Sequence, residues 1–188
     1  MNAWHDVSWG TNIKDFFNVV IEIPEGSKVK YELDKSTGLL RADRLLYSAV
    51  HYPANYGFIP QTYCDDGDPL DVLLLCQEPL LPLSIARCRA IGVLPMSDEK
   101  GTDDKVVGIH IDDPQVAHYH DVSELPPHML AELERFFLDY KSLEKKVVST
   151  DAFRGSVEAE RVIAAAIDLY AKQIARSTRP AFGNLKSP

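Results

Sequence analysis

Four aspartates stand close together within residues 65–71, separated only by a glycine, a proline and a leucine. Like charges this close repel one another, so a stable fold either leaves them in solvent or uses them to hold a cation. A polar turn is the plainer interpretation, because Asp, Gly and Pro are common turn residues. The alternative is a binding site for a divalent cation. A short apolar run at 72–76 follows and indicates that the acidic stretch leads into a buried strand.

A second acidic stretch contains Asp98 and Asp103. Together with Asp66, Asp68 and Asp71 it offers hard oxygen ligands without an accompanying His or Cys. Such ligands suit Mg²⁺, or Mn²⁺ as a substitute, and do not suit zinc. An EF-hand is excluded, because its loop needs an oxygen ligand at the fifth position and a glycine at the sixth. Counted from Asp66, those positions hold a leucine and an aspartate.

Cations and tyrosines of the kinds that contact phosphate groups are spread over the rest of the chain: Lys30, Arg44, Tyr56, Lys105, Tyr140 and Lys141. Taken singly, each has a plainer interpretation as a surface charge or a packed ring. Arg offers a planar fork to phosphate oxygens and Lys a point charge. Their combination with many carboxylates in one small chain points to a phosphoryl group held by metal ions and basic donors.

The elements that must position these residues begin with short strands. Residues 28–33 alternate strictly between polar and apolar, and turn residues flank them on both sides. The pattern over 18–45 is that of three consecutive strands in a β-meander, with Arg44 near the end of the third. A further strand or two is expected within 47–60. Other strands are predicted at 71–76, 85–94 and 105–111.

Two helices are expected after about residue 125, and each carries an apolar stripe. The stripe of the first helix consists of Met129, Leu133, Phe136 and Tyr140. The second helix is predicted over 156–176, with a stripe of Ile163, Ile167, Tyr170 and Ile174. Many short strands followed by two helices predict an α+β domain in which a mostly antiparallel sheet closes into a barrel.

The bulk properties limit the classes of function. A length of 188 residues suits one domain, and the net charge of −8 argues against nucleic acid as the main partner. A phosphate substrate is still compatible with that charge, because a bound metal ion inverts the sign of a site. The chain has no apolar run of about 18 residues, so no membrane span is expected. Its first residues lack the basic and apolar regions of a signal peptide, so we expect a cytoplasmic protein.

Several segments resemble, in order, those of the soluble inorganic pyrophosphatases of family I. The most specific is Asp66-Gly67-Asp68-Pro69-Leu70-Asp71, which is similar to the D-G-D-P-x-D signature of that family. The others are Val20-Ile21-Glu22-Ile23-Pro24, Lys30-Tyr31-Glu32, Asp43-Arg44, Tyr52-Pro53-x-Asn55-Tyr56-Gly57, Met96-x-Asp98-Glu99, Asp103-x-Lys105 and Tyr140-Lys141-x-Leu143-Glu144. The resemblance covers about 15–148, whereas the first dozen residues and the tail after Ser177 carry no signature.

The resemblance implies an OB-like, closed five-stranded β-barrel with additional short strands and two flanking C-terminal helices. It implies a single domain over 1–188, in which 1–14 form an N-terminal extension and 177–188 a loose tail. The implied activity belongs to phosphate metabolism: Mg²⁺-dependent hydrolysis of pyrophosphate to two orthophosphates. The short chain resembles the prokaryotic type, which is commonly a homohexamer, although no residue in the chain specifies that assembly.

The resemblance also assigns the acidic residues. Asp66, Asp71 and Asp103 resemble the ligands of a first metal ion, and Asp71 also reaches a second. Asp98 and Glu22 resemble acidic partners of further metal ions that arrive with substrate, so that several Mg²⁺ ions share one site.

The remaining roles concern the substrate. Asp68 resembles the carboxylate that takes the proton of the attacking water, and Tyr56 lies beside the metals and forms hydrogen bonds in the site. By the same resemblance, the phosphate contacts are expected to be Lys30, Arg44, Lys105, Tyr140 and Lys141. The implied mechanism is metal-assisted attack of water on a phosphoryl group, with no covalent enzyme intermediate.

Two other functions compete with this one. An OB-type barrel with aromatic residues could bind single-stranded nucleic acid, although the acidic charge balance and the two aspartate clusters disfavour that. A protein that only binds divalent ions is the second alternative. Release of phosphate from pyrophosphate, measured with and without Mg²⁺, separates all three.

Overall fold

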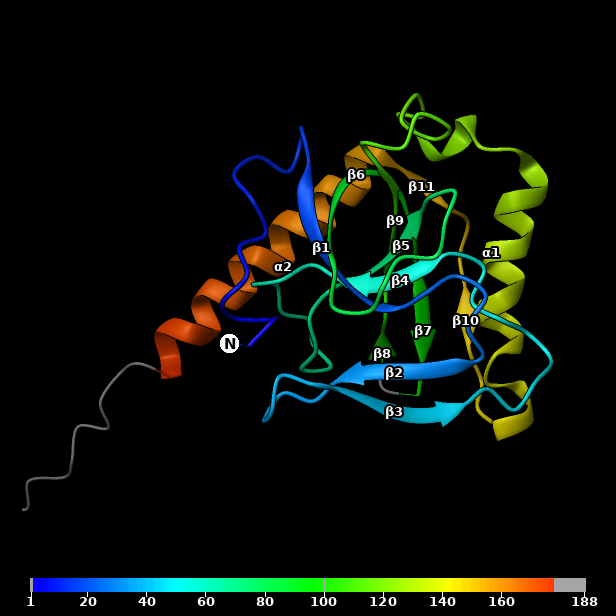
Figure 1. Ribbon diagram of the computed structural model, residues 1–188, viewed down its shortest axis with the longest axis horizontal. Coiled ribbons are helices and arrows are strands. Elements are labelled where there is room, and N and C mark those ends of the chain that lie inside the picture. The colour runs from blue at the N-terminus through cyan, green and yellow to red at the C-terminus, as the bar shows by residue number, and fades with distance from the viewer. Residues whose placement is uncertain (1, 100, 178–188) are drawn as a thin grey trace, which may run out of the picture.

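A closed barrel of five strands forms the centre of the computed structural model, which describes residues 2–99 and 101–177 (Figure 1). Around the barrel the strands follow the order β1, β4, β5, β9, β6 and back to β1. Their bounds are Phe17–Ile23 for β1, Asn55–Phe58 for β4, Asp71–Leu75 for β5, Ile85–Leu94 for β6 and Lys105–His110 for β9. All neighbours are antiparallel except β5 and β9, which confirms the predicted barrel.

A separate hairpin of β2 (Val29–Leu33) and β3 (Leu40–Leu45) lies beside one end of the barrel (Figure 1). The meander predicted over 18–45 is therefore wrong. β1 pairs with β4 on one edge and with β6 on the other, so neither edge is left for β2. Within the hairpin Lys30 pairs with Arg44, which places two basic residues side by side.

Small strands extend this framework. β7 (Met96–Asp98) lies between β8 (Gly101–Thr102) and β10 (Ser149–Thr150) in a three-stranded sheet. β11 (Arg154–Gly155) adds to the edge of β6. In the second acidic stretch of the sequence, Asp98 therefore belongs to β7, and Asp103 follows β8 directly and donates its N–H to the Met96 carbonyl at 2.8 Å.

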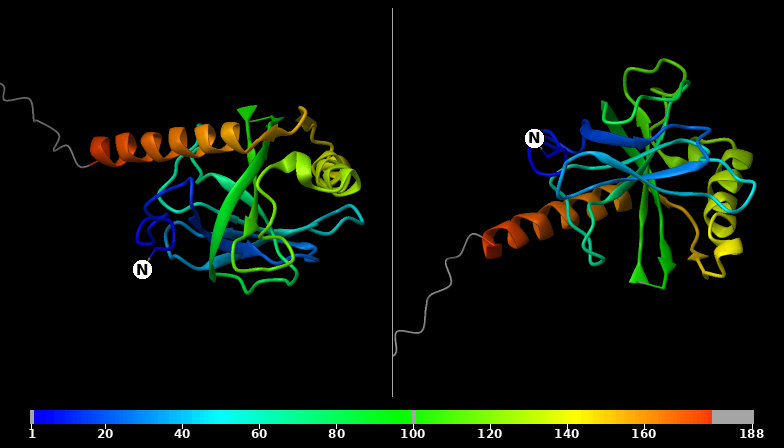
Figure 2. Two further views of the ribbon diagram at one scale, coloured as in Figure 1. Left: turned by 90° about the horizontal axis from the view of Figure 1, so that it is seen from above. Right: turned by 60° about the horizontal axis from the view of Figure 1, so that its bottom comes forward.

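The two predicted helices are present as α1 (Pro127–Asp139) and α2 (Ser156–Ser177), and they cover different sides of the barrel (Figure 2). Two short 3-10 helices, η1 (Val122–Glu124) and η2 (Ser142–Glu144), precede and follow α1. The end of α2 projects beyond the barrel (Figure 2), and Ile174 of its predicted stripe is 40% exposed. The tail predicted from residue 177 lies, beyond Ser177 itself, outside the described residues.

The side chains of β5 alternate between two groups of buried apolar residues, as the pleat of a strand requires. Leu73 and Leu75 pack with the group that includes Leu133 and Phe136 of the α1 region. Val72 and Leu74 pack with the group that includes Ile163 of α2. One buried strand therefore anchors both helices, and its first residue, Asp71, stands where the acidic loop ends.

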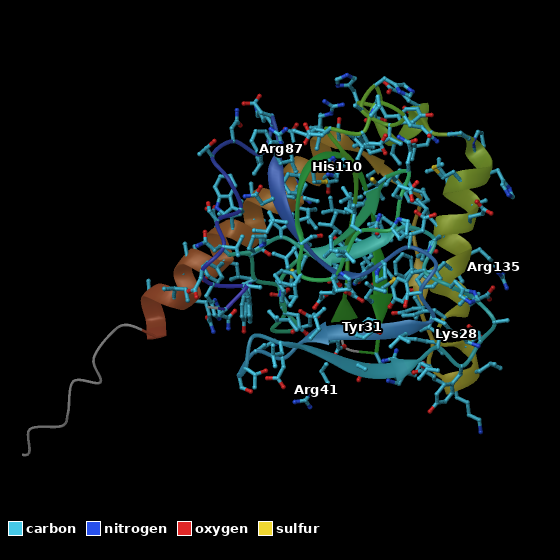
Figure 3. The ribbon with its side chains drawn as sticks, in the orientation of Figure 1. Lys28, Tyr31, Arg41, Arg87, His110 and Arg135 are labelled. Carbon is cyan, nitrogen blue, oxygen red and sulfur yellow. The ribbon has the colours of Figure 1, made fainter. Side chains whose placement is uncertain are left out.

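The barrel has two distinct ends. Arg87 and His110 lie toward one end and Tyr31 and Arg41, on the hairpin, toward the other (Figure 3). The acidic loop and the hairpin meet at the second end. Among the described residues, no helix is both long and apolar enough to cross a membrane.

Candidate active site

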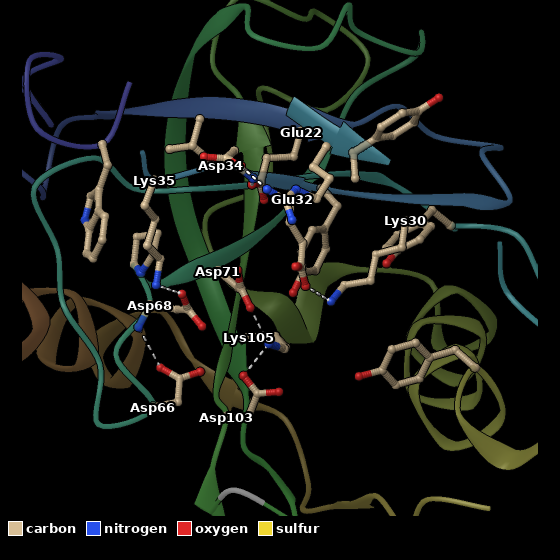
Figure 4. A pocket seen from close by; sticks show the side chains of 18 of the residues that line it. Glu22, Lys30, Glu32, Asp34, Lys35, Asp66, Asp68, Asp71, Asp103 and Lys105 are labelled. Atoms are coloured by element: carbon tan, nitrogen blue, oxygen red, sulfur yellow. Dashed lines mark hydrogen bonds and ion pairs between the residues drawn. The ribbon is translucent and has the colours of Figure 1, made fainter. Parts of the chain in front are cut away.

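A pocket of about 600 Å³ lies between the β2–β3 hairpin, the acidic loop, the start of β9 and the end of α1. It brings together residues that the sequence spreads over 120 positions: Glu22, Lys30, Tyr56, Asp66, Asp68, Asp71, Asp103, Lys105, Tyr140 and Lys141. Carboxylates gather on the loop and strand side, as Figure 4 shows for Asp66, Asp68, Asp71 and Asp103. Lys30 approaches from the hairpin.

The acidic loop is held by its own backbone and by one threonine. Gly67 N–H donates to the Cys64 carbonyl at 3.0 Å, and Cys64 N–H donates to the Asp68 carbonyl at 2.8 Å. Gly67 has a φ of +88°, a conformation that other residues adopt only with strain. The buried Thr62 hydroxyl accepts from Leu70 N–H at 2.8 Å. These bonds fix the directions in which the loop carboxylates point.

Lys105 lies at the centre of the acidic cluster and is only 2% exposed. Its Nζ is 2.5 Å from Asp71 Oδ2 and 2.5 Å from Asp103 Oδ1 (Figure 4). Burial alone would lower the pKa of Lys105, but the neighbouring carboxylates of Asp71 and Asp103 raise it above its usual value. The side chain therefore carries a positive charge that the carboxylates hold in place.

Asp66 and Glu22 lie in surroundings that disfavour their charged forms. Burial raises the pKa of Asp66, and the nearby charges of Asp68, Asp103 and Asp71 raise it further. Burial and then Asp71 raise the pKa of Glu22 to about 8, although Leu33 N–H donates to Glu22 Oε1 at 2.7 Å. A nearby cation favours the charged form of a carboxylate, which is the opposite of the effect that burial and like charges have on Asp66 and Glu22.

The residues present fit a divalent cation by their chemistry, because carboxylate oxygens are the ligands that Mg²⁺ and Mn²⁺ prefer. Within the described part of the chain, no three His, Cys, Asp or Glu side chains already converge at metal-binding distances. The carboxylates of Asp71 and Asp103 are instead bound to the Lys105 ammonium, which lies between them.

Tyr56 and Tyr140 form the aromatic part of the pocket. Tyr56 is 8% exposed, and Lys105 Nζ lies 5.8 Å from the centre of its ring. Burial raises the pKa of Tyr56 well above the usual value, so the hydroxyl stays protonated. Tyr140 is stacked on Phe136 with ring centres 5.4 Å apart, and Lys141 Nζ lies 5.1 Å from the Tyr140 ring centre.

Two predicted residues are not part of the pocket lining as described. Arg44 pairs across the hairpin with Lys30, which does line the pocket, and its Nη1 donates to Asp43 at 2.6 Å and its Nε to Glu144 at 2.8 Å. Asp98 belongs to β7, and the position of its side chain is outside the described structure.

Other residues of the pocket were missed by sequence reasoning: Trp4, Glu32, Asp34, Lys35, Arg41 and Thr102. Lys35 forms an ion pair with Asp68 (Figure 4), and Lys30 forms one with Glu32. Charged residues at both ends of the predicted strand at 28–33 were the available signal for the hairpin residues. The sequence holds no corresponding signal for Trp4.

Comparison with known proteins finds relatives that span most of the chain. The family model described as inorganic pyrophosphatase matches residues 19–171. A soluble inorganic pyrophosphatase from Zea mays is 54% identical over 178 residues, which is 95% of this chain and 83% of the maize protein. Soluble inorganic pyrophosphatase 2 from Chlamydomonas reinhardtii is 53% identical over 169 residues, or 90% of this chain and 88% of the algal protein.

Solved structures agree with the sequence comparison. The inorganic pyrophosphatase from Thermus thermophilus superposes with a TM-score of 0.87 at 38% identity, covering 91% of this chain and 99% of that one. The inorganic phosphatase from Anaplasma phagocytophilum superposes with a TM-score of 0.85 at 41% identity, covering 88% and 99%. Because the family model and these relatives span most of the sequence, this chain belongs to the inorganic pyrophosphatase family.

Proposed function

We propose that this protein is a hydrolase that converts inorganic pyrophosphate to two orthophosphates with Mg²⁺ as its cofactor. The observation that carries the proposal is one pocket in which Asp66, Asp68, Asp71 and Asp103 face Lys30, Lys105, Tyr140 and Lys141. Such a pocket supplies both a carboxylate side for metal ions and a basic side for phosphate oxygens.

Asp66, Asp71 and Asp103 are the proposed ligands of a first Mg²⁺, and Asp71 also contributes to a second. Asp98 and Glu22 serve the ions that accompany substrate, and Mn²⁺ is the expected substitute. When bound, the ions lower the pKa of water and neutralise phosphate charge. Tyr56 lines the same pocket as Asp71 and supplies a protonated hydroxyl beside the carboxylates.

Side chains of the protein accept the proton of the water and bind the phosphate groups of the substrate. The water oxygen forms a bond to phosphorus as its proton passes to Asp68, and the bridging P–O bond breaks to release orthophosphate. Lys30, Arg44, Lys105, Tyr140 and Lys141 contact the phosphate oxygens, and the cations among them offset the charge of the leaving group. No covalent enzyme intermediate is part of this proposal.

The test is phosphate release from pyrophosphate, with and without Mg²⁺, by wild-type protein and by Asp68→Asn and Asp71→Asn. Each substitution is expected to lower turnover about 100-fold or more, Asp68→Asn by removing the proton acceptor and Asp71→Asn by weakening both metal ions. Asp112→Asn is the matched control, because Asp112 pairs with Arg87 away from the pocket. Wild-type turnover by Asp71→Asn at millimolar Mg²⁺ would contradict the site assignment.

An inactive wild-type protein would instead favour one of the two binding functions. Salt-sensitive binding of an oligonucleotide would identify a nucleic-acid module, and Mg²⁺ binding without hydrolysis would identify an ion binder.

We also propose a cytoplasmic homohexamer. The resemblance to the prokaryotic type supports the assembly, and a solution mass measurement tests it. Cell fractionation tests the location.

A further inference from the structure

The N-terminal segment, defined as residues 2–7, contacts through Trp4 the residues that directly precede the acidic loop. Trp4 is 5% exposed, and its Nε1 donates to the Thr62 carbonyl at 2.8 Å. Its ring stacks on Tyr63 with ring centres 5.9 Å apart, and the centre of the Tyr170 ring, on α2, lies 6.4 Å from that of Trp4. The ring is thereby fixed between the residues that precede the acidic loop and the C-terminal helix.

Lys35 reaches the same place from the turn between β2 and β3. Asp34 holds that turn by accepting from the N–H groups of Ser36 and Thr37, both at 3.0 Å. The Lys35 carbonyl accepts from Asn2 Nδ2 at 3.1 Å, so the N-terminal segment contacts Lys35 at its backbone as well.

Three groups converge on the Lys35 ammonium. Its Nζ lies 5.2 Å from the centre of the Trp4 ring and donates to the Gly67 carbonyl at 3.0 Å. It also forms an ion pair with Asp68 Oδ1 (Figure 4). An aromatic face attracts a cation, so Trp4 draws the ammonium toward the loop that bears Asp68.

We propose that Lys35 is a positioning residue for Asp68 and that Trp4 holds Lys35 in place. This inference rests on the proposed function, in which Asp68 accepts the proton of the attacking water. The N-terminal segment then becomes part of the site, although no motif in the sequence marks it.

The exposure of the pair supports positioning as the role of Lys35. The side chains of Lys35 and Asp68 are 48% and 45% exposed, and ion pairs this exposed contribute little to stability. Their effect lies in orientation, because a carboxylate that accepts a proton has to point at the water. With the Lys35 charge removed, Asp68 keeps its backbone anchors at the loop and loses the partner of its side chain.

The first experiment compares Lys35→Met and Lys35→Arg in phosphate release from pyrophosphate at saturating Mg²⁺. Lys35→Met is expected to lower kcat about tenfold with little change in KM, because a misdirected group costs rate rather than ground-state binding. Lys35→Arg keeps the charge and the contact with an aromatic face, and it is expected to restore most of kcat. Lys14→Met, which removes another exposed lysine, is the control. The proposal is overturned if Lys35→Met leaves kcat unchanged, or if it raises KM without lowering kcat.

The second experiment tests the role of Trp4. Trp4→Leu is expected to lower kcat in the same direction, and the double variant with Lys35→Met is expected to be no worse than Lys35→Met alone. If the fold-loss in kcat of the double variant equals the product of the two single losses, Trp4 does not act through Lys35. The control is Trp9→Leu, because Trp9 is half-buried in a different apolar cluster. Thermal melting checks folding, and Trp4→Phe supplies a milder variant that keeps an aromatic face.

A third measurement is independent of catalysis. Trp4 and Trp9 are the two tryptophans of the chain, so Trp9→Phe leaves Trp4 as the only tryptophan fluorophore. Removing the Lys35 charge is expected to change the emission of Trp4, and an unchanged spectrum overturns the contact. If wild-type protein releases no phosphate, the proposed function is refuted. An unchanged Trp4 spectrum refutes only the contact between Trp4 and Lys35, so the two results can be told apart.

Discussion

Arg44 Nε donates to Glu144 Oε1 at 2.8 Å, which joins β3 of the hairpin to η2 after α1. The two side chains are 22% and 9% exposed, so the pair is more sheltered than most surface ion pairs. Glu144 thereby sets the direction of the Arg44 guanidinium from a part of the chain 100 residues away. The hairpin and the end of α1 form two walls of one pocket, and this ion pair ties them together.

Glu144→Gln is expected to weaken substrate binding, because the Arg44 guanidinium loses one of its two carboxylate partners and keeps only Asp43. We expect KM for pyrophosphate to rise about tenfold, which corresponds to about 1.4 kcal/mol of lost phosphate contact. Steady-state kinetics measure this, with Glu132→Gln on the exposed face of α1 as the control. An unchanged KM would mean that Asp43 alone positions Arg44.

Binding of Mg²⁺ is expected to raise the melting temperature, because an ion that binds only the folded protein stabilises it. At a concentration 100 times its Kd the gain is about 2.7 kcal/mol. Asp71→Asn is expected to lose most of this shift. It is also expected to lower the melting temperature without metal, because Lys105 is left with only Asp103. Differential scanning calorimetry with Mg²⁺ and with chelator measures both effects.

The control for that experiment is Asp112→Asn, which removes an acidic side chain outside the pocket. It should keep the full Mg²⁺-dependent shift. An equal loss in both variants would indicate a general effect of net charge and would contradict Asp71 as a ligand.

The parts of the fold that the sequence predicts are those with a local signal. The alternation and the apolar runs identify the strands, because their period reflects the pleat of the backbone. The spacing of Leu133, Phe136 and Tyr140 identifies the buried face of the first helix. The acidic loop is local too, since Gly67 and the aspartates beside it lie within a few residues of one another.

The parts that were missed depend on contacts between distant segments. Periodicity marks a strand but does not say which edges pair, so the sequence pattern predicts a meander that continues β1 and not a separate hairpin. In the second helix the apolar stripe is buried at Ile163 but 40% exposed at Ile174, because the end of the helix extends beyond the barrel. The contact of Trp4 with Lys35 likewise exists only once the hairpin has folded over the acidic loop.

Asp113 is expected to stabilise the fold in a pH-dependent way. It is 6% exposed and accepts from Gln77 N–H at 2.7 Å, Gln77 Nε2 at 2.6 Å and Gln115 N–H at 2.9 Å. Burial alone would raise its pKa, but these hydrogen bonds lower it to about 2. Because the pKa is lower in the folded state, the stabilisation is present above about pH 4 and is lost as the pH falls toward 2.

Asp113→Asn is therefore expected to reduce the free energy of unfolding by about 2 kcal/mol at neutral pH, since it exchanges an accepting oxygen for a donor. The gap between wild type and variant should shrink as the pH falls below about 4. Urea denaturation of both proteins at several pH values measures it. If the difference in the free energy of unfolding does not vary with pH, the effect comes from the hydrogen-bond geometry and not from the charge of Asp113.

Two glycines are expected to respond differently to Ala, because different atoms occupy the space of the missing side chain. At Gly57 an added Cβ would lie 2.0 Å from the Val20 carbonyl oxygen, so β1 and β4 have to separate. At Gly108 it would lie 2.2 Å from Cys88 Sγ and 3.0 Å from the Arg89 carbonyl oxygen. The main obstacle at Gly108 is therefore a removable side-chain atom, whereas the obstacle at Gly57 is backbone.

Gly57→Ala and Gly108→Ala are each expected to cost about 3 kcal/mol or more of stability. Adding Cys88→Ala should recover much of the loss at Gly108, so that the double variant is more stable than the sum of the single effects predicts. The same addition should recover nothing at Gly57, which makes that pair the matched control. Urea denaturation of the five variants gives the coupling. A strictly additive result at Gly108 would mean that the Arg89 backbone, and not Cys88, limits how closely β6 and β9 approach.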